Sequence, residues 1–281
     1  MQFSLSVRVA EAACKTRLNV PVRDLTQMAA ALGYSAICMR ASGAGVQTSR
    51  EERVRLRADI EDAGLRVSMV TADYDVPLNN ANGPNSLRDI GPSLDVAEDF
   101  GCDLIRICMK NESDIEHACR AADQAAARGI RLAHQCHTGS LFEEVEPTLA
   151  LLERIGRPNF GLIYEPANLM LCGQSYGLDT LQRFAPFLMN VYVQNHIVDD
   201  AGPVELETYC LGPRRFHHLP LWEPGGVDYS SVFNALKTIG YEGTITVHQA
   251  EKTETLDDAR EYAARCMEWL NKMHQQAIPL L

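Results

Sequence analysis

The sequence predicts a single-domain α/β fold, a (β/α)8 TIM barrel that spans residues 1–281. The main observation is a repeat: short apolar segments alternate eight times with amphipathic or charged segments of helical length. A second observation concerns the first strand, which no Gly-x-Gly-x-x-Gly loop follows, although an open nucleotide-binding sheet usually carries one. We therefore expect a closed parallel barrel, with the functional site at the carboxyl ends of its strands.

The N-terminal half of the chain contains the first four strand and helix units. Apolar runs predict strands at residues 3–7, 36–40, 66–72 and 104–109. Amphipathic or charged segments predict helices at 22–32, 49–63, 86–100 and 113–128. A glycine follows each of these helices, where a left-handed backbone commonly ends a helix. Ser113 and Glu116 have the spacing of a capping box for the fourth helix.

The C-terminal half repeats the same alternation. Strands are expected at 130–135, in the runs that end at Glu165 and Gln194, and at 244–248. Helices are expected at 141–155, 178–184, 229–239 and 256–273. Long connections at 73–85 and 199–226 follow the third and seventh strands, so both should cover the face that carries the site.

Composition and charge limit the partners of this chain. A formal charge of −11 and a pI near 5.2 argue against nucleic acid as a partner, because phosphate binding needs clustered lysine and arginine. No apolar run reaches membrane-spanning length, and the first residues do not have the pattern of a secretory signal. Nine cysteines without Cys-x-x-Cys spacing are typical of reduced thiols. We expect a cytoplasmic protein that acts on a small molecule and forms a homo-oligomer.

Polar side chains end four neighbouring strands of the predicted barrel. Glu165 stands between an apolar run and Pro166, which cannot continue a sheet. The side chains that end the other three strands are Gln135, Gln194 and His248. Two further imidazoles, His137 and His196, lie two positions beyond the glutamines and so share their faces of the strands. Since parallel strands end at the same mouth of a barrel, these groups should converge.

Three segments of the chain form a recognisable set: residues 165–169 (Glu-Pro-Ala-Asn-Leu), 222–229 (Trp-Glu-Pro-Gly-Gly-Val-Asp-Tyr) and 239–243 (Ile-Gly-Tyr-Glu-Gly). With the order and spacing of the strand and helix units, they resemble the xylose isomerase-like TIM-barrel superfamily of sugar phosphate isomerases and epimerases, and the similarity extends over essentially the whole chain. In most members, Glu, Asp, His and Glu at the ends of strands five to eight hold one divalent metal. The resemblance therefore implies one divalent ion, Mn, Zn, Co or Mg, held by Gln135, Glu165, Gln194 and His248. This set has one carboxylate in place of three, which should weaken binding of a hard dication.

The resemblance also implies roles in catalysis. His248 is expected to be the general base, with an ordinary pKa near 6.5 and an activity that rises through roughly pH 6 to 7. Glu165 and His137 complete the predicted catalytic set. Predicted substrate-binding residues are His196, Arg106, Arg214 and Trp222, and Tyr74 is a second aromatic ring that could stack on a sugar.

The predicted reaction is the isomerisation or epimerisation of a sugar or keto-sugar through an enediolate-type proton transfer, assisted by the metal. One alternative is a lyase or dehydratase that acts on a related keto-sugar. Another is a barrel that binds carbohydrate without turning it over. A DNA abasic-site endonuclease, also known in this superfamily, is disfavoured by the acidic charge and by the small number of carboxylate and imidazole ligands.

Overall fold

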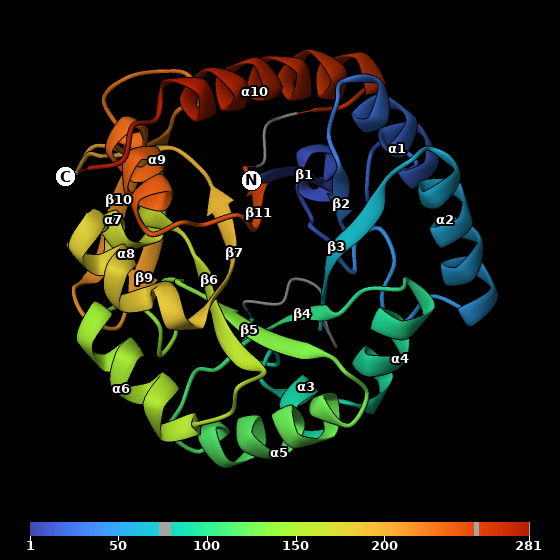
Figure 1. Ribbon diagram of the computed structural model, residues 1–281, viewed down its shortest axis with the longest axis horizontal. Coiled ribbons are helices and arrows are strands. Elements are labelled where there is room, and N and C mark those ends of the chain that lie inside the picture. Colours follow the sequence, from blue (N-terminus) through green and yellow to red (C-terminus); the bar gives the residue numbers. More distant parts are fainter. Residues whose placement is uncertain (73–79, 250–252, 281) are drawn as a thin grey trace.

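The computed structural model describes residues 1–72, 80–249 and 253–280, and it confirms the predicted barrel. Eight parallel strands close in the order β1-β11-β7-β6-β5-β4-β3-β2, and helices surround them (Figure 1). The strands are β1 (Gln2–Ser6), β2 (Ala36–Cys38), β3 (Arg66–Thr71), β4 (Leu104–Ile107), β5 (Arg131–Gln135), β6 (Phe160–Tyr164), β7 (Leu188–Val193) and β11 (Thr244–Val247).

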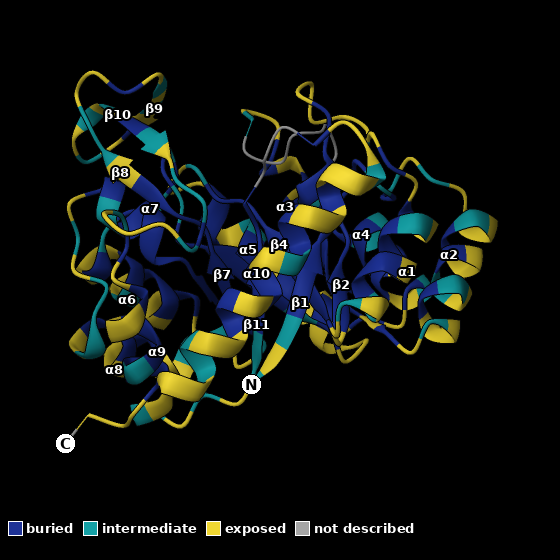
Figure 2. Ribbon diagram, turned by 90° about the horizontal axis from the view of Figure 1, so that it is seen from above, coloured by how far each residue is buried: buried dark blue, intermediate teal, exposed yellow. Residues whose placement is uncertain are grey.

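Most of the helices bury one face against the sheet and expose the other, as Figure 2 shows, whereas α7 exposes no residue. The helices are α1 (Val22–Ala31), α2 (Arg50–Asp62), α3 (Asn85–Arg88), α4 (Gly91–Asp99), α5 (Asp114–Ala126), α6 (Val145–Ile155), α7 (Pro166–Leu171), α8 (Leu178–Phe184), α9 (Tyr229–Thr238) and α10 (Leu256–Gln276). In α5 the buried alanines are Ala118, Ala121, Ala122 and Ala125, which share one helical stripe. Among the helices described, none combines the length and apolarity of a membrane span.

A plug of six side chains fills the barrel interior: Cys38, Met69, Leu104, Ala133, Ile163 and Tyr192. Side chains on a strand point inward at every second position. Residues two positions beyond the plug therefore point toward the axis one layer higher, at the carboxyl end of the sheet. Those residues are Arg40, Thr71, Arg106, Gln135, Glu165 and Gln194. The pleat of the strands thus sets the chemistry of the barrel mouth.

Two predictions about helix boundaries were wrong. The single helix expected at 86–100 is two helices, because Asp89 has φ −143° and ψ 85° and Pro92 is tolerated only in the first turn of α4. The capping box of Ser113 does not form, since Ser113 has helical backbone angles and its side chain makes no capping bond. The side chain of Asp114 instead accepts hydrogen bonds from the backbone N–H groups of Lys110 and Asn111, at 2.8 and 2.9 Å.

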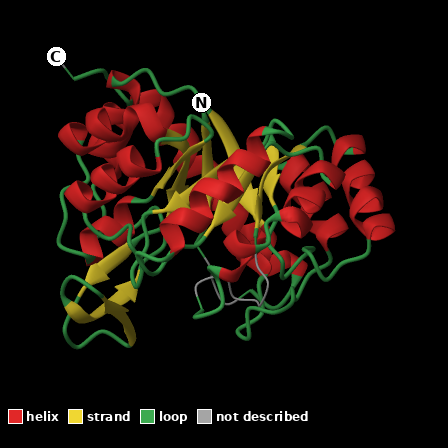
Figure 3. Cartoon of the chain, turned by 90° about the horizontal axis from the view of Figure 1, so that it is seen from below, coloured by secondary structure: helices red, strands yellow, loops and turns green. Residues whose placement is uncertain are grey.

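The long connection predicted after the seventh strand contains a small antiparallel sheet. Its strands are β8 (His196–Val198), β9 (Val204–Thr208) and β10 (Gly212–His218), in the order β8-β10-β9. Figures 2 and 3 show that this sheet projects from one side of the barrel, beside α7. Sequence analysis missed it because polar and charged residues occupy most of β9 and β10.

A buried carboxylate, Glu143, attaches this projecting sheet to the barrel. Its oxygens accept hydrogen bonds from the backbone N–H groups of Tyr209, at 2.9 and 2.8 Å, and of Cys210, at 2.9 Å. The N–H of Gly139, in the loop after β5, donates to the same carboxylate at 2.5 Å. Glu143 therefore joins the turn between β9 and β10 to the loop that follows β5.

We predict that Glu143→Ala lowers the free energy of unfolding by about 3 kcal/mol, because it leaves several buried N–H groups without an acceptor. The measurement is urea denaturation followed by circular dichroism. Glu146→Ala is the matched control, since Glu146 is exposed and pairs only at the surface with Arg183; it should cost less than about 1 kcal/mol. Equal losses of unfolding free energy in the two variants would contradict the role of Glu143 in attaching the projecting sheet to the barrel.

Candidate functional site

Glu165 is the centre of the polar groups at the mouth. It follows β6 in an extended conformation (φ −141°, ψ 103°), because Pro166 takes the first position of α7, where a missing N–H costs nothing. Its side chain is fully buried, and its oxygens accept hydrogen bonds from the amides of Gln135 and Gln194. Asn168 in the first turn of α7 donates to the same carboxylate at 3.0 Å. The ends of β5, β6 and β7 therefore meet at one carboxyl group.

Burial changes the ionisation of Glu165. Removal from water raises the pKa of this carboxyl from 4.5 to about 8, although Arg106, Arg8 and the hydrogen bond from Gln194 act in the opposite direction. At neutral pH most of the molecules therefore carry a protonated Glu165, which can donate a proton.

His248 follows β11 and is also fully buried. Its ring stacks on Tyr192 of the plug, with centroids 3.8 Å apart and planes 8° from parallel. Within residues 1–72, 80–249 and 253–280, neither ring nitrogen has a hydrogen-bond partner. Burial, followed by the charges of Arg8, Arg40 and Arg106, lowers the pKa of His248 well below 6.5. The imidazole is thus neutral at pH 7, and the expected rise of activity moves to lower pH than the ordinary histidine pKa implies.

Three arginines occupy the opposite half of the mouth. Arg8 lies in a 3-10 turn (Val7–Ala10) directly after β1, Arg40 follows β2, and Arg106 is on β4. Glu11 accepts hydrogen bonds from Arg40 Nε at 2.9 Å and from Ser42 Oγ at 2.6 Å. Sequence analysis named Arg106 but missed Arg8 and Arg40. The sequence contained a signal that could have located Arg40 at the mouth, since this residue lies two positions beyond the inward-pointing Cys38.

The two other predicted histidines lie in different surroundings. His137 is half-buried after β5, and its Nδ1 lies 2.7 Å from the carbonyl oxygen of Thr138. His196 was expected at a barrel strand end, but it begins β8, where its Nδ1 lies 3.1 Å from Nδ1 of His218. Burial lowers the pKa of His196 to about 3. His196 therefore packs with the projecting sheet.

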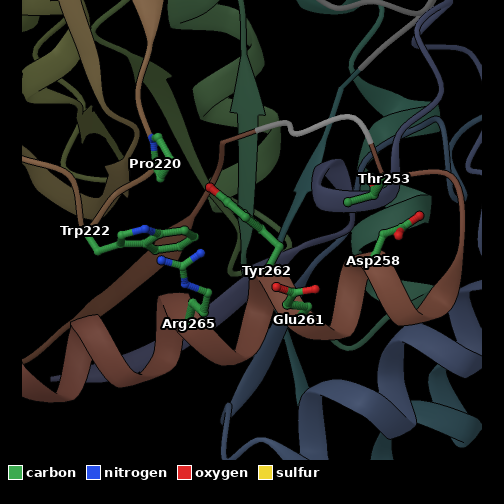
Figure 4. Close-up of a pocket in the computed structure, with 7 residues that line it drawn as sticks. All are labelled: Pro220, Trp222, Thr253, Asp258, Glu261, Tyr262 and Arg265. Atoms are coloured by element: carbon green, nitrogen blue, oxygen red, sulfur yellow. The ribbon is translucent and has the colours of Figure 1, made fainter.

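The remaining predicted binding residues make contacts outside the ring of strand ends. Arg214 on β10 donates from Nε to the carbonyl of Leu171 at 3.1 Å. Trp222 lines a cavity of about 280 Å³ beside α10, shown in Figure 4. There the guanidinium of Arg265 lies 3.9 Å from the centroid of the Trp222 ring. Tyr74 lies outside the described residues.

The donor set at the mouth is a poor fit for a hard divalent cation. Its one carboxylate, Glu165, already accepts three amide N–H groups, and three arginines lie across the mouth. Such ions prefer several anionic oxygen ligands. Among the residues described, the one group of His, Cys, Asp and Glu close enough to share an ion is Glu143, Cys172 and Cys210. The oxygens of Glu143 are taken by the backbone N–H groups of the projecting sheet.

Comparison with known proteins agrees with the fold. A curated relative, the inosose dehydratase of Geobacillus thermodenitrificans (strain NG80-2), is 24% identical over 154 residues, which are 54% of this chain and 51% of the relative. The chain thus aligns with about half the length of that relative.

Solved structures similar to this chain include the probable 3-DHS dehydratase from Bacillus anthracis, with TM-score 0.71, 16% identity, and coverage of 96% of this chain and 99% of that one. The D-psicose 3-epimerase from Clostridium cellulolyticum H10, solved with D-tagatose, has TM-score 0.69 and 11% identity over 98% and 99% of the two chains. A xylose isomerase-like TIM-barrel protein from Mycobacterium smegmatis, in complex with magnesium, has TM-score 0.66 and 16% identity, covering 97% of each chain.

The family-level match covers most of the chain. The sequence profile of the xylose isomerase-like TIM barrel matches residues 26–273, from within α1 to within α10. Named relatives in this group include dehydratases and an epimerase, all of them enzymes. With the closed barrel of eight strands, this match identifies the chain as a member of the xylose isomerase-like TIM-barrel family.

Proposed function

We propose that this protein is a dehydratase that removes a proton next to the carbonyl of a hydroxylated, sugar-like substrate and then releases water. The observation that carries the proposal is the buried His248, whose two ring nitrogens lack partners among the described residues. A buried polar group without a partner costs stability, so its position at the mouth is best explained by a ligand that completes its hydrogen bonds.

The two steps use groups of opposite character. A ring nitrogen of His248 takes the proton from the carbon beside the carbonyl, and the C–H electron pair forms an enolate. The enolate re-forms the carbonyl as a carbon–carbon double bond develops and the neighbouring C–O bond breaks. Glu165, protonated because burial raises its pKa to about 8, gives its proton to the departing hydroxyl, which leaves as water. His248 then returns its proton to the solvent or to Glu165.

The pair of His248 as base and Glu165 as acid fits elimination better than epimerisation. Epimerisation by two bases needs one group to remove a proton on one face of the carbon and a second to return one on the other face. The carboxylates that serve this purpose in the sugar epimerases are absent here, since Gln135 and His248 occupy the corresponding strand ends. The names of two relatives, an inosose dehydratase and a probable 3-DHS dehydratase, also support elimination.

A divalent metal at Glu165, His248, Gln135 and Gln194 stays a prediction from the family resemblance. One structural neighbour was solved in complex with magnesium, which supports a divalent ion as a ligand of this fold. The charge and hydrogen bonding of the present residues do not favour it, so no step above is assigned to a metal.

We predict that His248→Asn slows proton exchange by about 10²- to 10⁴-fold, the usual contribution of a general base. The measurement is incorporation of deuterium from D₂O into a panel of inososes and keto-sugars, followed by mass spectrometry. His117→Asn on the outer helix α5 is the control and should exchange at the wild-type rate. If no compound exchanges although ligands still bind, the alternative of a non-catalytic carbohydrate-binding barrel is correct.

We predict that the wild-type protein loses about 1 kcal/mol of stability between pH 7 and pH 8, and that Glu165→Gln does not. The folded protein holds a proton on Glu165 up to about pH 8, whereas the unfolded chain has released it by pH 5. Unfolding therefore releases a proton, and stability falls as the pH rises. Urea titrations of both proteins at the two pH values measure this difference. Parallel curves would show that Glu165 is already ionised at pH 7.

We predict that removal of metal leaves deuterium exchange unchanged. The purified protein is dialysed against EDTA, its metal content is measured by mass spectrometry, and the exchange rate is compared before and after. If the wild-type protein binds one equivalent of Mg, Mn, Co or Zn and Glu165→Gln does not, the metal-dependent reaction implied by the family resemblance is correct and the metal-free reaction proposed here is wrong.

A further inference from the structure

The barrel mouth is electrostatically divided between two contiguous halves of the sheet. Strands β1, β2 and β4 contribute Arg8, Arg40 and Arg106, whereas β5, β6, β7 and β11 contribute Gln135, Glu165, Gln194 and His248. The order of strands in the barrel keeps each set together, because β1 to β4 form one arc and the other strands form the second.

The charges on the arginine side are only partly balanced. Glu11 pairs with Arg40, and the side-chain exposures of the two are 2% and 3%. Arg106 is 95% buried, since 5% of its surface is accessible, and within the described residues it forms no ion pair and its Nε has no hydrogen-bond partner. Arg8 Nε is likewise buried without a partner there. Among the described residues, Glu11 forms an ion pair with Arg40, whereas Arg8 and Arg106 form none.

The position of Arg106 directs its charge into the site. It lies two residues beyond Leu104 of the plug, on the inward side of β4, and its guanidinium carbon is 5.9 Å from the centroid of the Tyr192 ring. The ring of His248 stacks on the same tyrosine. A group bound to Arg106 would therefore lie near the proposed base.

We propose that the substrate carries a compact oxyanion, a carboxylate or a phosphate, which Arg106 and Arg8 bind while the reacting carbon faces His248 and Glu165. The oxyanion site rests on the arginines that form no ion pair. The placement of the reacting carbon at His248 and Glu165 rests on the proposed function. An unpaired buried charge is expensive, whereas guanidinium groups bind carboxylate and phosphate through paired, charge-assisted hydrogen bonds. Arg40 stays in its ion pair with Glu11 and adds electrostatic attraction for the anion.

The test is isothermal titration calorimetry with three polyhydroxylated probes: D-gluconate as a carboxylate, glucose 6-phosphate as a phosphate, and D-glucitol as a neutral compound. We expect one of the two anions to bind and D-glucitol to bind at least tenfold more weakly. Arg106→Met should raise the dissociation constant of the anion by about 10- to 100-fold, the usual effect of losing a charged hydrogen bond. Arg8→Met should act in the same direction, and Arg154→Met, at an exposed site on α6, should bind like the wild type.

A thermal melt of each variant separates binding from folding. Arg106→Met should melt no lower than the wild type, because it removes a buried charge that makes no ion pair among the described residues. A lower melting temperature together with unchanged anion binding would give Arg106 a structural role and overturn the inference. Equal affinity for D-glucitol and the anions would also overturn the inference.

These results can be separated from those for the proposed reaction. Anion binding that depends on Arg106, without deuterium exchange in any substrate, would refute the dehydratase proposal and leave the oxyanion site in place. Deuterium exchange in neutral keto-sugars, with no preference for anions, would support the reaction and refute the oxyanion site.

Discussion

The alternation of side chains along closed parallel strands is the constraint on which this protein depends. Once the six side chains of the plug fill the interior, the residues two positions later on the same strands must point into the mouth of the barrel. A one-residue shift of any strand would exchange an inward polar residue for an apolar neighbour and expose part of the core. Packing of the plug and composition of the site are therefore set by the same register.

Burial then gives these strand ends their chemical character. The same loss of water favours the neutral forms of Glu165 and His248, raising the pKa of the acid and lowering that of the base. The groups thereby acquire complementary roles at neutral pH without a direct ion pair between them. The arginines on the facing arc remain charged and supply the attraction that neutral groups lack.

Sequence reasoning predicted most of the fold because its signals are local and repeated. Apolar runs located all eight barrel strands, and the glycines after the first helices adopt positive φ at Gly33, Gly64, Gly101 and Gly129, as expected. Local patterns failed where polar residues form strands, as in β9 and β10, and where Pro92 divides a helix. For Ser113, the capping box fails because this residue has helical backbone angles, and the side chain of Asp114 binds the N–H groups of Lys110 and Asn111 just before the helix.

The site was predicted only in part, because its properties arise from contacts between distant segments. The polar strand ends could be read from the chain, and the structure places Gln135 and Gln194 against Glu165. The sequence did not reveal that Arg8 and Arg40 would lie near Arg106, since this depends on the closure of β1 and β2 onto the rest of the barrel. It also placed His196 at the wrong strand end, because the start of β8 lies only three residues beyond the end of β7.

The small sheet formed by β8, β9 and β10 differs from the barrel in one respect: it has free edges. In the part of the chain that the structure describes, β9 is an outer strand, and one of its sides presents backbone groups without a strand partner. Glu205 and Glu207 are exposed on this strand, and Glu205 is paired with Arg215 of β10, so a second copy that approached edge to edge would meet the charge of Glu207 and would compete with that ion pair. The acidic residues that concealed β9 from sequence analysis thus disfavour edge-to-edge pairing of this strand.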